Sequence, residues 1–251
     1  MAVAEANRAV SARRAKRLAG KFDRMLKRSG DGLNARFGEE EAGAMRREML
    51  DEYRRLILEV PSIGGRKNML SGTLIGTAQP LAVFRVVIRH GGTAEETGGL
   101  LRREIETQLG RIPRALRHAM GRYRFSRLKI RQFERAARRS QTRRYPDDWV
   151  FEVVEGDGET FDTGVDHIEC GIVKFLHAHD ADELTPYICD LDYVLAEAMG
   201  YGLRRTKTLA WGCDRCDFRL TKNGATSPPW PPQFVERTCG EPAAAAGGPA
   251  A

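Results

Sequence analysis

The hydrophobic pattern of this chain changes its period near residue 146, and this change limits the folds that the chain can adopt. Before it, segments rich in Ala, Leu, Arg and Glu predict helices at residues 4–27, 39–59, 68–90 and 94–109, with further arginine-rich helices to about residue 139. After it, the segment WVFEVVEG at 149–156 combines aromatic and β-branched residues and predicts a strand. A helical N-terminal half followed by a small antiparallel sheet with packed helices is an α+β fold.

Turn and capping residues set the expected ends of these elements. Thr93 and Glu96 have the spacing of a capping box, and Pro80 is expected to kink or split the helix at 68–90. After the first strand we expect two helices, followed by two strands that pair across the turn GCDR. The expected helices are 165–177 and 185–199, and the expected strands are 203–211 and 216–221.

Composition divides the chain into three parts. Residues 1–60 form basic N-terminal helices, residues 61–223 form the α+β domain, and residues 224–251, rich in Pro, Gly and Ala, are expected to be disordered. The N-terminal segment has no apolar signal region, and the chain has no apolar run of about 18 residues. We therefore expect a cytoplasmic protein without a membrane partner, whose oligomeric state stays open.

Charge is segregated along the chain. Residues 102–144 carry fifteen Arg and Lys against three acids, whereas residues 145–199 carry fifteen Asp and Glu against one Lys. We expect the basic run to be a helical surface that partly complements the acidic segment. No recognised nucleic-acid motif accompanies the arginines, so nucleic acid is not an expected partner, although binding through the basic helices remains a further alternative.

Five cysteines, an odd number, are too few for a disulfide scaffold in a chain of 251 residues and indicate reduced thiols. Strand alternation places Cys216 on the inward face with Phe218, and places Asp217 and Arg219 on the opposite face. Cys213 lies in the preceding turn. The remaining cysteine, in the C-terminal tail, has no predicted role.

Two predicted helices carry the other candidate groups. Helical spacing places Asp192 within an apolar arc with Cys189 at its edge, and points Asp190 away. A carboxylate on an apolar face needs a partner, which is either a structural cation or amide, or a ligand. Cys170 lies beside cationic residues, among them Lys174, and such neighbours favour the thiolate.

A metal site is an alternative use of these thiols. Cys213 and Cys216 form one C-x-x-C pair, whereas zinc knuckles usually contain two. The alternative zinc ligands are Cys170, Cys189, Cys213 and Cys216. We find no cofactor motif and expect no cofactor.

The segments ECGIVKF and ELTPYICDLDYVLAEAMGYGLRRTKTLAWGCDRCDFRL together resemble the L-2-amino-thiazoline-4-carboxylic acid hydrolase family, and VPSIGGRKNML and HGGTAEE resemble it more weakly. The resemblance implies a hydrolase that opens a small cyclic isothiourea to a carbamoyl amino acid. The matching positions in the two longer segments are Cys170, Cys189, Asp192, Gly212, Cys216, Asp217, Phe218 and Arg219.

That chemistry suits the residues present. An amidine-like carbon needs a nucleophile, and one of Cys170, Cys189 or Cys216 would attack it or orient a water molecule. Asp192 or Asp217 would hold the amidinium and move protons. Which thiol acts is not decided by the sequence.

Two further residues are candidates for substrate binding. Arg219 would hold the substrate carboxylate with two hydrogen bonds, and Asn68 would either contact the substrate or cap a helix. The main rival function is a zinc-containing small-molecule sensor without catalysis, because separated cysteines ending in GCDRCDF also resemble vinyl-reductase-type ligand-binding domains.

Overall fold

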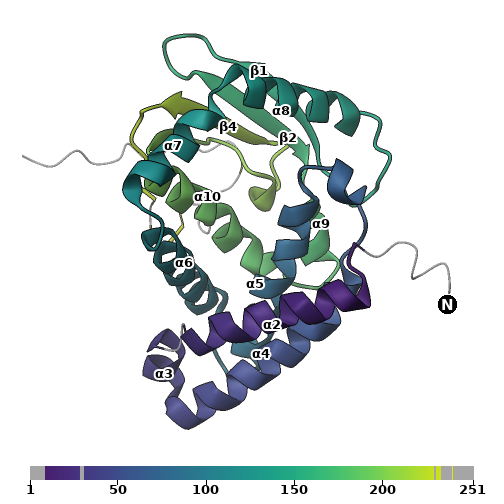
Figure 1. Ribbon diagram of the computed structural model, residues 1–251, viewed down its shortest axis with the longest axis vertical. Coiled ribbons are helices and arrows are strands. Elements are labelled where there is room, and N and C mark those ends of the chain that lie inside the picture. The colour runs from purple at the N-terminus through teal and green to yellow at the C-terminus, as the bar shows by residue number, and fades with distance from the viewer. Residues whose placement is uncertain (1–8, 29–30, 229, 233–238, 240–251) are drawn as a thin grey trace, which may run out of the picture.

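The computed structural model describes residues 9–28, 31–228, 230–232 and 239. Within them, the chain forms nine α-helices and a four-stranded antiparallel sheet (Figure 1), which confirms the predicted α+β class. The helices are α2 (Ala12–Arg28), α3 (Asp31–Phe37), α4 (Glu39–Glu59), α5 (Ser71–Arg89), α6 (Ala94–Gly110), α7 (Arg114–Arg124), α8 (Arg127–Ser140), α9 (Gly171–His177) and α10 (Thr185–Met199). The strands are β1 (Val150–Glu155), β2 (Thr163–Glu169), β3 (Tyr201–Arg204) and β4 (Cys216–Lys222), in the order β1-β2-β4-β3.

The N-terminal helices share their core with the rest of the chain. Helices α2 and α4 lie side by side at one end of the molecule (Figure 1), and the Phe22 and Tyr53 rings meet there at 4.7 Å. Helix α4 also packs on α5, where the buried Glu52 carboxylate accepts a 3.0 Å hydrogen bond from Arg85 and contacts Arg55 and Arg89. A buried carboxylate is tolerated when several cations surround it, so this cluster fixes α4 against α5.

Helix α5 is the central core helix. By length and composition it could span a membrane, but 61% of its apolar window is buried inside this fold, against α4, α6 and α9. Pro80 lies within the helix, which continues through it, so of the two predicted effects of the proline, splitting is wrong. Buried residues before and after the proline, such as Leu74 and Val86, hold both halves in the core, and tertiary packing thereby outweighs the helix-breaking tendency. The predicted capping box of Thr93 and Glu96 is confirmed at the start of α6.

The sheet has an inner face, covered by helices, and an outer face. Cross-strand pairing aligns Phe151, His167 and Cys216 in one row of the inner face. Helix α8 packs over this face, with the Phe133 ring 6.3 Å from that of Phe151. The outer face carries Glu152, Asp166, Asp217, Arg219 and Thr221.

Two segments fold differently from their predictions. Residues 165–169, expected to begin a helix, belong to strand β2, because neighbouring strands on both sides pair with it. Strand β3 ends at Arg204 rather than residue 211, and the chain then forms a 3₁₀ turn at Leu209–Trp211. The reason is that the Asp217 carboxylate accepts the Thr206 and Lys207 amide protons, at 2.8 and 2.6 Å, in place of a ladder partner.

Two ion pairs join the basic run of residues 102–144 to the acidic segment of residues 145–199, as the charge pattern predicts. Among the described residues, Arg102 and Arg143 are the members of the basic run that form ion pairs with acids of residues 145–199. Their partners are Asp190 and Glu169. Most of the arginines of α7 and α8 instead lie on the molecular surface, so the solvated helical surface is the larger part of that prediction.

Helix α10 is enclosed on several sides, so the predicted single apolar face is wrong. It packs against α6, α7, α9 and β3. Two glycines let neighbouring helices approach α10 closely. A Cβ atom on Gly98 would lie 2.4 Å from the Tyr187 ring, and one on Gly121 would lie 2.1 Å from the Met199 carbonyl oxygen. Asp190, expected to point away from the core, is fully buried, and its nearest cation is Arg102 at 3.7 Å.

Burial raises the pKa of Asp190 from 3.8 to about 6, and Arg102 opposes this shift only partly. A carboxyl group whose pKa is higher in the folded state stabilises the fold below its unfolded pKa and loses that contribution as pH rises through its folded pKa. We therefore expect the free energy of unfolding of the wild type, relative to Asp190→Asn, to fall by on the order of 3 kcal/mol between pH 3.5 and 6.5. Urea unfolding of both proteins across this range measures the difference, and a constant difference would contradict the prediction.

The described part of residues 224–251 contacts the folded body, although the sequence predicts no packing for this segment. The Thr226 hydroxyl accepts from the Leu203 amide and donates to the Tyr201 carbonyl, both at 2.8 Å. The Trp230 ring lies 6.1 Å from that of Tyr187. Cys213 forms a disulfide with Cys239, which corrects the expectation that all five thiols are reduced. The predicted disorder of the other tail residues lies outside the described residues.

We expect truncation after Asn223 to lower the free energy of unfolding by roughly 2–4 kcal/mol, because it removes a disulfide together with these contacts. The matched comparison is Thr226→Val, which keeps the disulfide and removes two hydrogen bonds, at a cost of about 1–2 kcal/mol. Thermal and urea unfolding under non-reducing conditions measure both. A truncated chain as stable as the full one would show that the segment adds nothing to the fold.

Candidate active site

Three free thiols meet between the inner face of the sheet and α10. Cys216 begins β4, Cys189 lies in the first half of α10, and Cys170 is the residue that precedes α9. Cys170 and Cys216 are close enough to raise the pKa of Cys189 electrostatically, and Asp192 acts on all three thiols. The structure thus brings together four of the residues singled out in the sequence, from three separate elements.

Arg205 is the cation at the centre of this cluster. Its side chain is only 1% exposed, and it lies 3.4 Å from the Asp192 carboxylate and donates to the Cys189 carbonyl at 2.5 Å. Its guanidinium carbon lies 4.6 Å from the Tyr193 ring centroid and 4.7 Å from that of Phe218. The sequence gives no signal for this role, because an arginine in the run LRRTK is expected at a surface.

The thiols of the cluster are protonated at neutral pH. Burial raises the pKa of Cys170 to about 12, and burial also raises the pKa of Cys189 and of Cys216. The predicted bias of Cys170 toward thiolate is therefore wrong, since Lys174 is held by Glu169 and by the carbonyl oxygens of residues 146 and 148. The Leu209 amide donates to the Cys216 sulfur at 3.2 Å, a contact that favours the thiolate, and the amides of Ile172 and Val173 likewise lower the pKa of Cys170.

Asp192 is the carboxylate that faces the thiols. Its side chain is 44% exposed, yet protein groups surround it on the remaining sides, and this crowding raises its pKa. The guanidinium groups of Arg205 and Arg124 oppose that rise. Asp192 is therefore accessible from one side and bound to a cation on the other, which suits a group that contacts a small cationic ligand.

His167 belongs to the cluster and was missed in the sequence. It is the direct cross-strand partner of Cys216, and its ring lies 5.3 Å from those of both Phe151 and Phe218. Burial, then Arg205, lowers its pKa to about 4, and its Nδ1 atom is buried without a partner among the described residues. A neutral imidazole beside a thiol can accept the thiol proton. The alternation of TGVDHIE, read as a strand, would have placed His167 on the inner face.

Arg124, at the end of α7, is a second cation beside the cluster. It lowers the pKa of His167 and of Asp192, and its guanidinium lies 5.4 Å from the Tyr201 ring. It forms no ion pair within the described part of the chain, and its Nε atom is buried without a hydrogen bond there. It also borders a cavity of about 20 Å³ beneath α8. Arg124 is therefore available to an anionic group at the site.

Three predicted site residues lie elsewhere and have structural partners. Asp217 and Arg219 are on the outer face of the sheet, where Arg219 donates to Asp166 at 2.6 Å. The Asn68 amide donates to the Ile63 carbonyl at 2.8 Å and to Asp148 at 2.6 Å, and its oxygen accepts from the amide at the start of α5. Asn68 thus fixes the turn that precedes α5, and the predicted helix cap is wrong, because α5 has Leu70 at its N-cap and no side-chain cap hydrogen bond. Because neighbouring residues of a strand point to opposite faces, Cys216 lies on the inner face of the sheet and Asp217 on the outer face.

The four-cysteine zinc alternative is not assembled. Cys213 is bonded to Cys239, so it is not available as a ligand beside Cys216. In the ranges that the structure describes, no group of three or more His, Cys, Asp or Glu side chains has a metal-binding arrangement.

A comparison with protein families matches residues 76–220 to the family described as L-2-amino-thiazoline-4-carboxylic acid hydrolase. The match covers more than half of the chain and includes all three thiols, His167, Asp192 and Arg205. Comparisons with curated proteins and with solved structures find no match. The chain belongs to the L-2-amino-thiazoline-4-carboxylic acid hydrolase family.

Proposed function

We propose that this protein hydrolyses a small cyclic amidine or isothiourea related to 2-amino-thiazoline-4-carboxylate and releases a carbamoyl amino acid. The observation that carries the proposal is the meeting of three thiols, one imidazole, one carboxylate and two guanidinium groups on the inner face of the sheet. Such a set supplies a nucleophile, a base and binding groups of both charges, and it lies within the segment that matches the family.

Cys216 is the proposed nucleophile and His167 its base. The neutral imidazole takes the thiol proton, and the sulfur adds to the amidine carbon. The ring carbon–sulfur bond then breaks, and the imidazolium returns its proton to the ring sulfur. Water adds to the same carbon, and the Cys216 sulfur leaves and regains a proton. The net change is the addition of one water molecule, which gives the carbamoyl product. The 3.2 Å hydrogen bond from the Leu209 amide supports Cys216 as the thiolate that forms.

Binding roles follow from charge. Asp192 is partly exposed and lies near the thiols, so it would hold the amidinium of the substrate, while Arg205 fixes the carboxylate in position. Arg124 would bind the substrate carboxylate in place of Arg219, which is on the outer face. Cys170 and Cys189 would line the space around the reacting carbon.

Turnover of 2-amino-thiazoline-4-carboxylate, followed by mass spectrometry of the carbamoyl product, tests the nucleophile and base. We expect Cys216→Ser and His167→Ala each to lower kcat by a factor of about 10² or more, the effect of losing a positioned catalytic group. The matched control is the double variant Cys213→Ser/Cys239→Ser, which removes two sulfur atoms outside the cluster and should retain activity within a few-fold.

Three results would contradict this assignment. Full activity of Cys216→Ser with loss of activity in Cys170→Ser or Cys189→Ser would move the nucleophile to another thiol. No turnover of any cyclic amidine by the folded parent protein would remove the enzymatic proposal. One equivalent of zinc in the parent, released by each cysteine substitution in the cluster, would favour the sensor function instead.

Arg124→Ala is expected to raise KM roughly tenfold with a small change in kcat, because a charge-assisted hydrogen bond to the substrate carboxylate is lost. Arg219→Ala is the matched control, since it removes the same charge from the outer face and should leave KM unchanged. Steady-state kinetics of both variants measure this. A larger rise in KM for Arg219→Ala than for Arg124→Ala would reverse the assignment.

A further inference from the structure

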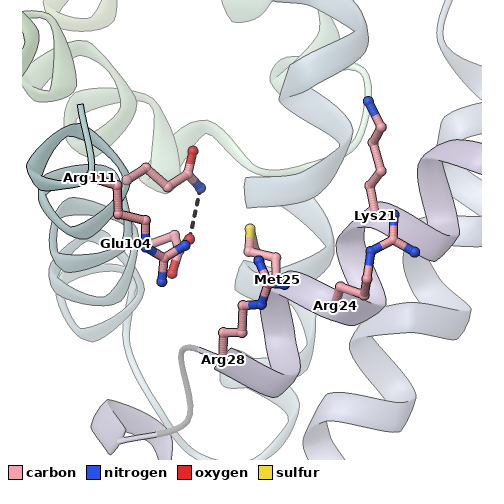
Figure 2. Close-up of a pocket in the computed structure, with 7 residues that line it drawn as sticks. Lys21, Arg24, Met25, Arg28, Glu104 and Arg111 are labelled. Atoms are coloured by element: carbon pink, nitrogen blue, oxygen red, sulfur yellow. Dashed lines mark hydrogen bonds between the residues drawn. The ribbon is translucent and has the colours of Figure 1, made fainter. Parts of the chain in front are cut away.

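A groove between α2 and α6 has an excess of positive charge and lies apart from the thiol cluster. Its volume is about 390 Å³, within the range of small-molecule sites, and it shares no lining residue with the proposed active site. Three cations from α2 line the groove together with Arg111, which follows the last turn of α6, and Figure 2 shows Arg28 between Arg111 and the other two. The lining residues are Lys21, Arg24, Met25, Arg28, Glu104, Gln108 and Arg111.

The spacing of the α2 cations directs them to one side of the helix. Lys21, Arg24 and Arg28 are three and four positions apart, so their side chains project from the same face. Like charges at this spacing repel one another and destabilise a helix. The only acid of α2, Asp23, does not relieve this repulsion, because it pairs with Lys27 at 2.7 Å.

The groove contains one carboxylate against four cations. Glu104 accepts a hydrogen bond from Gln108 at 2.7 Å, as Figure 2 shows. None of the four cations forms a salt bridge with any residue that the structure describes. The buried guanidinium of Arg205, by contrast, has a carboxylate partner in Asp192. The charge of the groove is thus not neutralised by the described chain.

We infer that this groove binds a small phosphorylated molecule that carries at least two phosphate groups. Three guanidinium groups can each bind phosphate oxygens with two parallel hydrogen bonds, and Lys21 adds a point charge. Because the cations lie on two opposite walls, a ligand with charges at two positions engages more of them than a single phosphate does. Met25 gives the less polar part of the ligand a surface to contact.

The probe is inorganic triphosphate, titrated calorimetrically into the full-length protein at about 0.15 M salt, where exposed charges more than about 8 Å apart are largely screened. We expect saturable binding of one triphosphate per chain, and about tenfold or greater weakening in Arg24→Ala/Arg111→Ala, which removes one guanidinium from each wall. The matched control is Arg13→Ala/Lys16→Ala, which removes two exposed cations of α2 that do not line the groove, and its affinity should stay within about twofold. Circular dichroism checks that each variant is folded.

Three outcomes would overturn the inference. Equal weakening in both double variants would mean that binding depends on net charge and not on the groove. The absence of saturation by about 1 mM triphosphate would mean that no site of useful affinity exists. Tight binding of a 20-base-pair DNA duplex that requires Arg24 and Arg111, without saturable triphosphate binding, would assign the groove to a nucleic-acid surface.

Discussion

The buried guanidinium of Arg205 is the interaction on which the candidate site depends. It is bound to the Asp192 carboxylate and to the Cys189 carbonyl, and it stacks between Tyr193 and Phe218, so it joins α10 to the sheet. A cation that is almost completely removed from water is stable only with such partners. Burial, together with this charge, lowers the pKa of His167 and keeps it neutral, and the same charge opposes the rise in the pKa of Asp192. One side chain therefore contributes both to the packing of α10 on the sheet and to the electrostatics of the cluster.

The proposed mechanism requires a nucleophile that is activated only during the reaction. Burial keeps the thiols protonated, and the same burial keeps the imidazole unprotonated and able to accept a proton. A neutral thiol and a neutral imidazole together hold the one proton that must be transferred when the sulfur attacks. No thiolate persists between reactions, and a persistent thiolate would be open to oxidation. The aromatic rings on both sides of His167 restrict its orientation toward Cys216.

The unpaired cations of the groove between α2 and α6 lie apart from the proposed active site. At the proposed active site each cation has a carboxylate, a carbonyl or an aromatic ring beside it. In the groove between α2 and α6, four cations face one carboxylate. Helix α6 contacts α10 on another side, where Gly98 receives the Tyr187 ring. The groove and the thiol cluster are therefore connected through two packed helices, although they share no residue.

The sequence alone determined the helical first half, the position of β4 and the inward direction of Cys216, because these follow from local periodicity and from strand alternation. It also placed Cys170, Cys189 and Asp192 in the site through the family motifs. Tertiary structure decided what local patterns cannot specify. Pairing with two neighbours made residues 163–169 a strand and brought His167 beside Cys216, and packing around α10 buried Asp190. The fold was likewise needed to show that Arg124 and Arg205, unlike Arg219, lie beside the thiols, because all three are arginines in polar segments and only their position relative to the sheet distinguishes them.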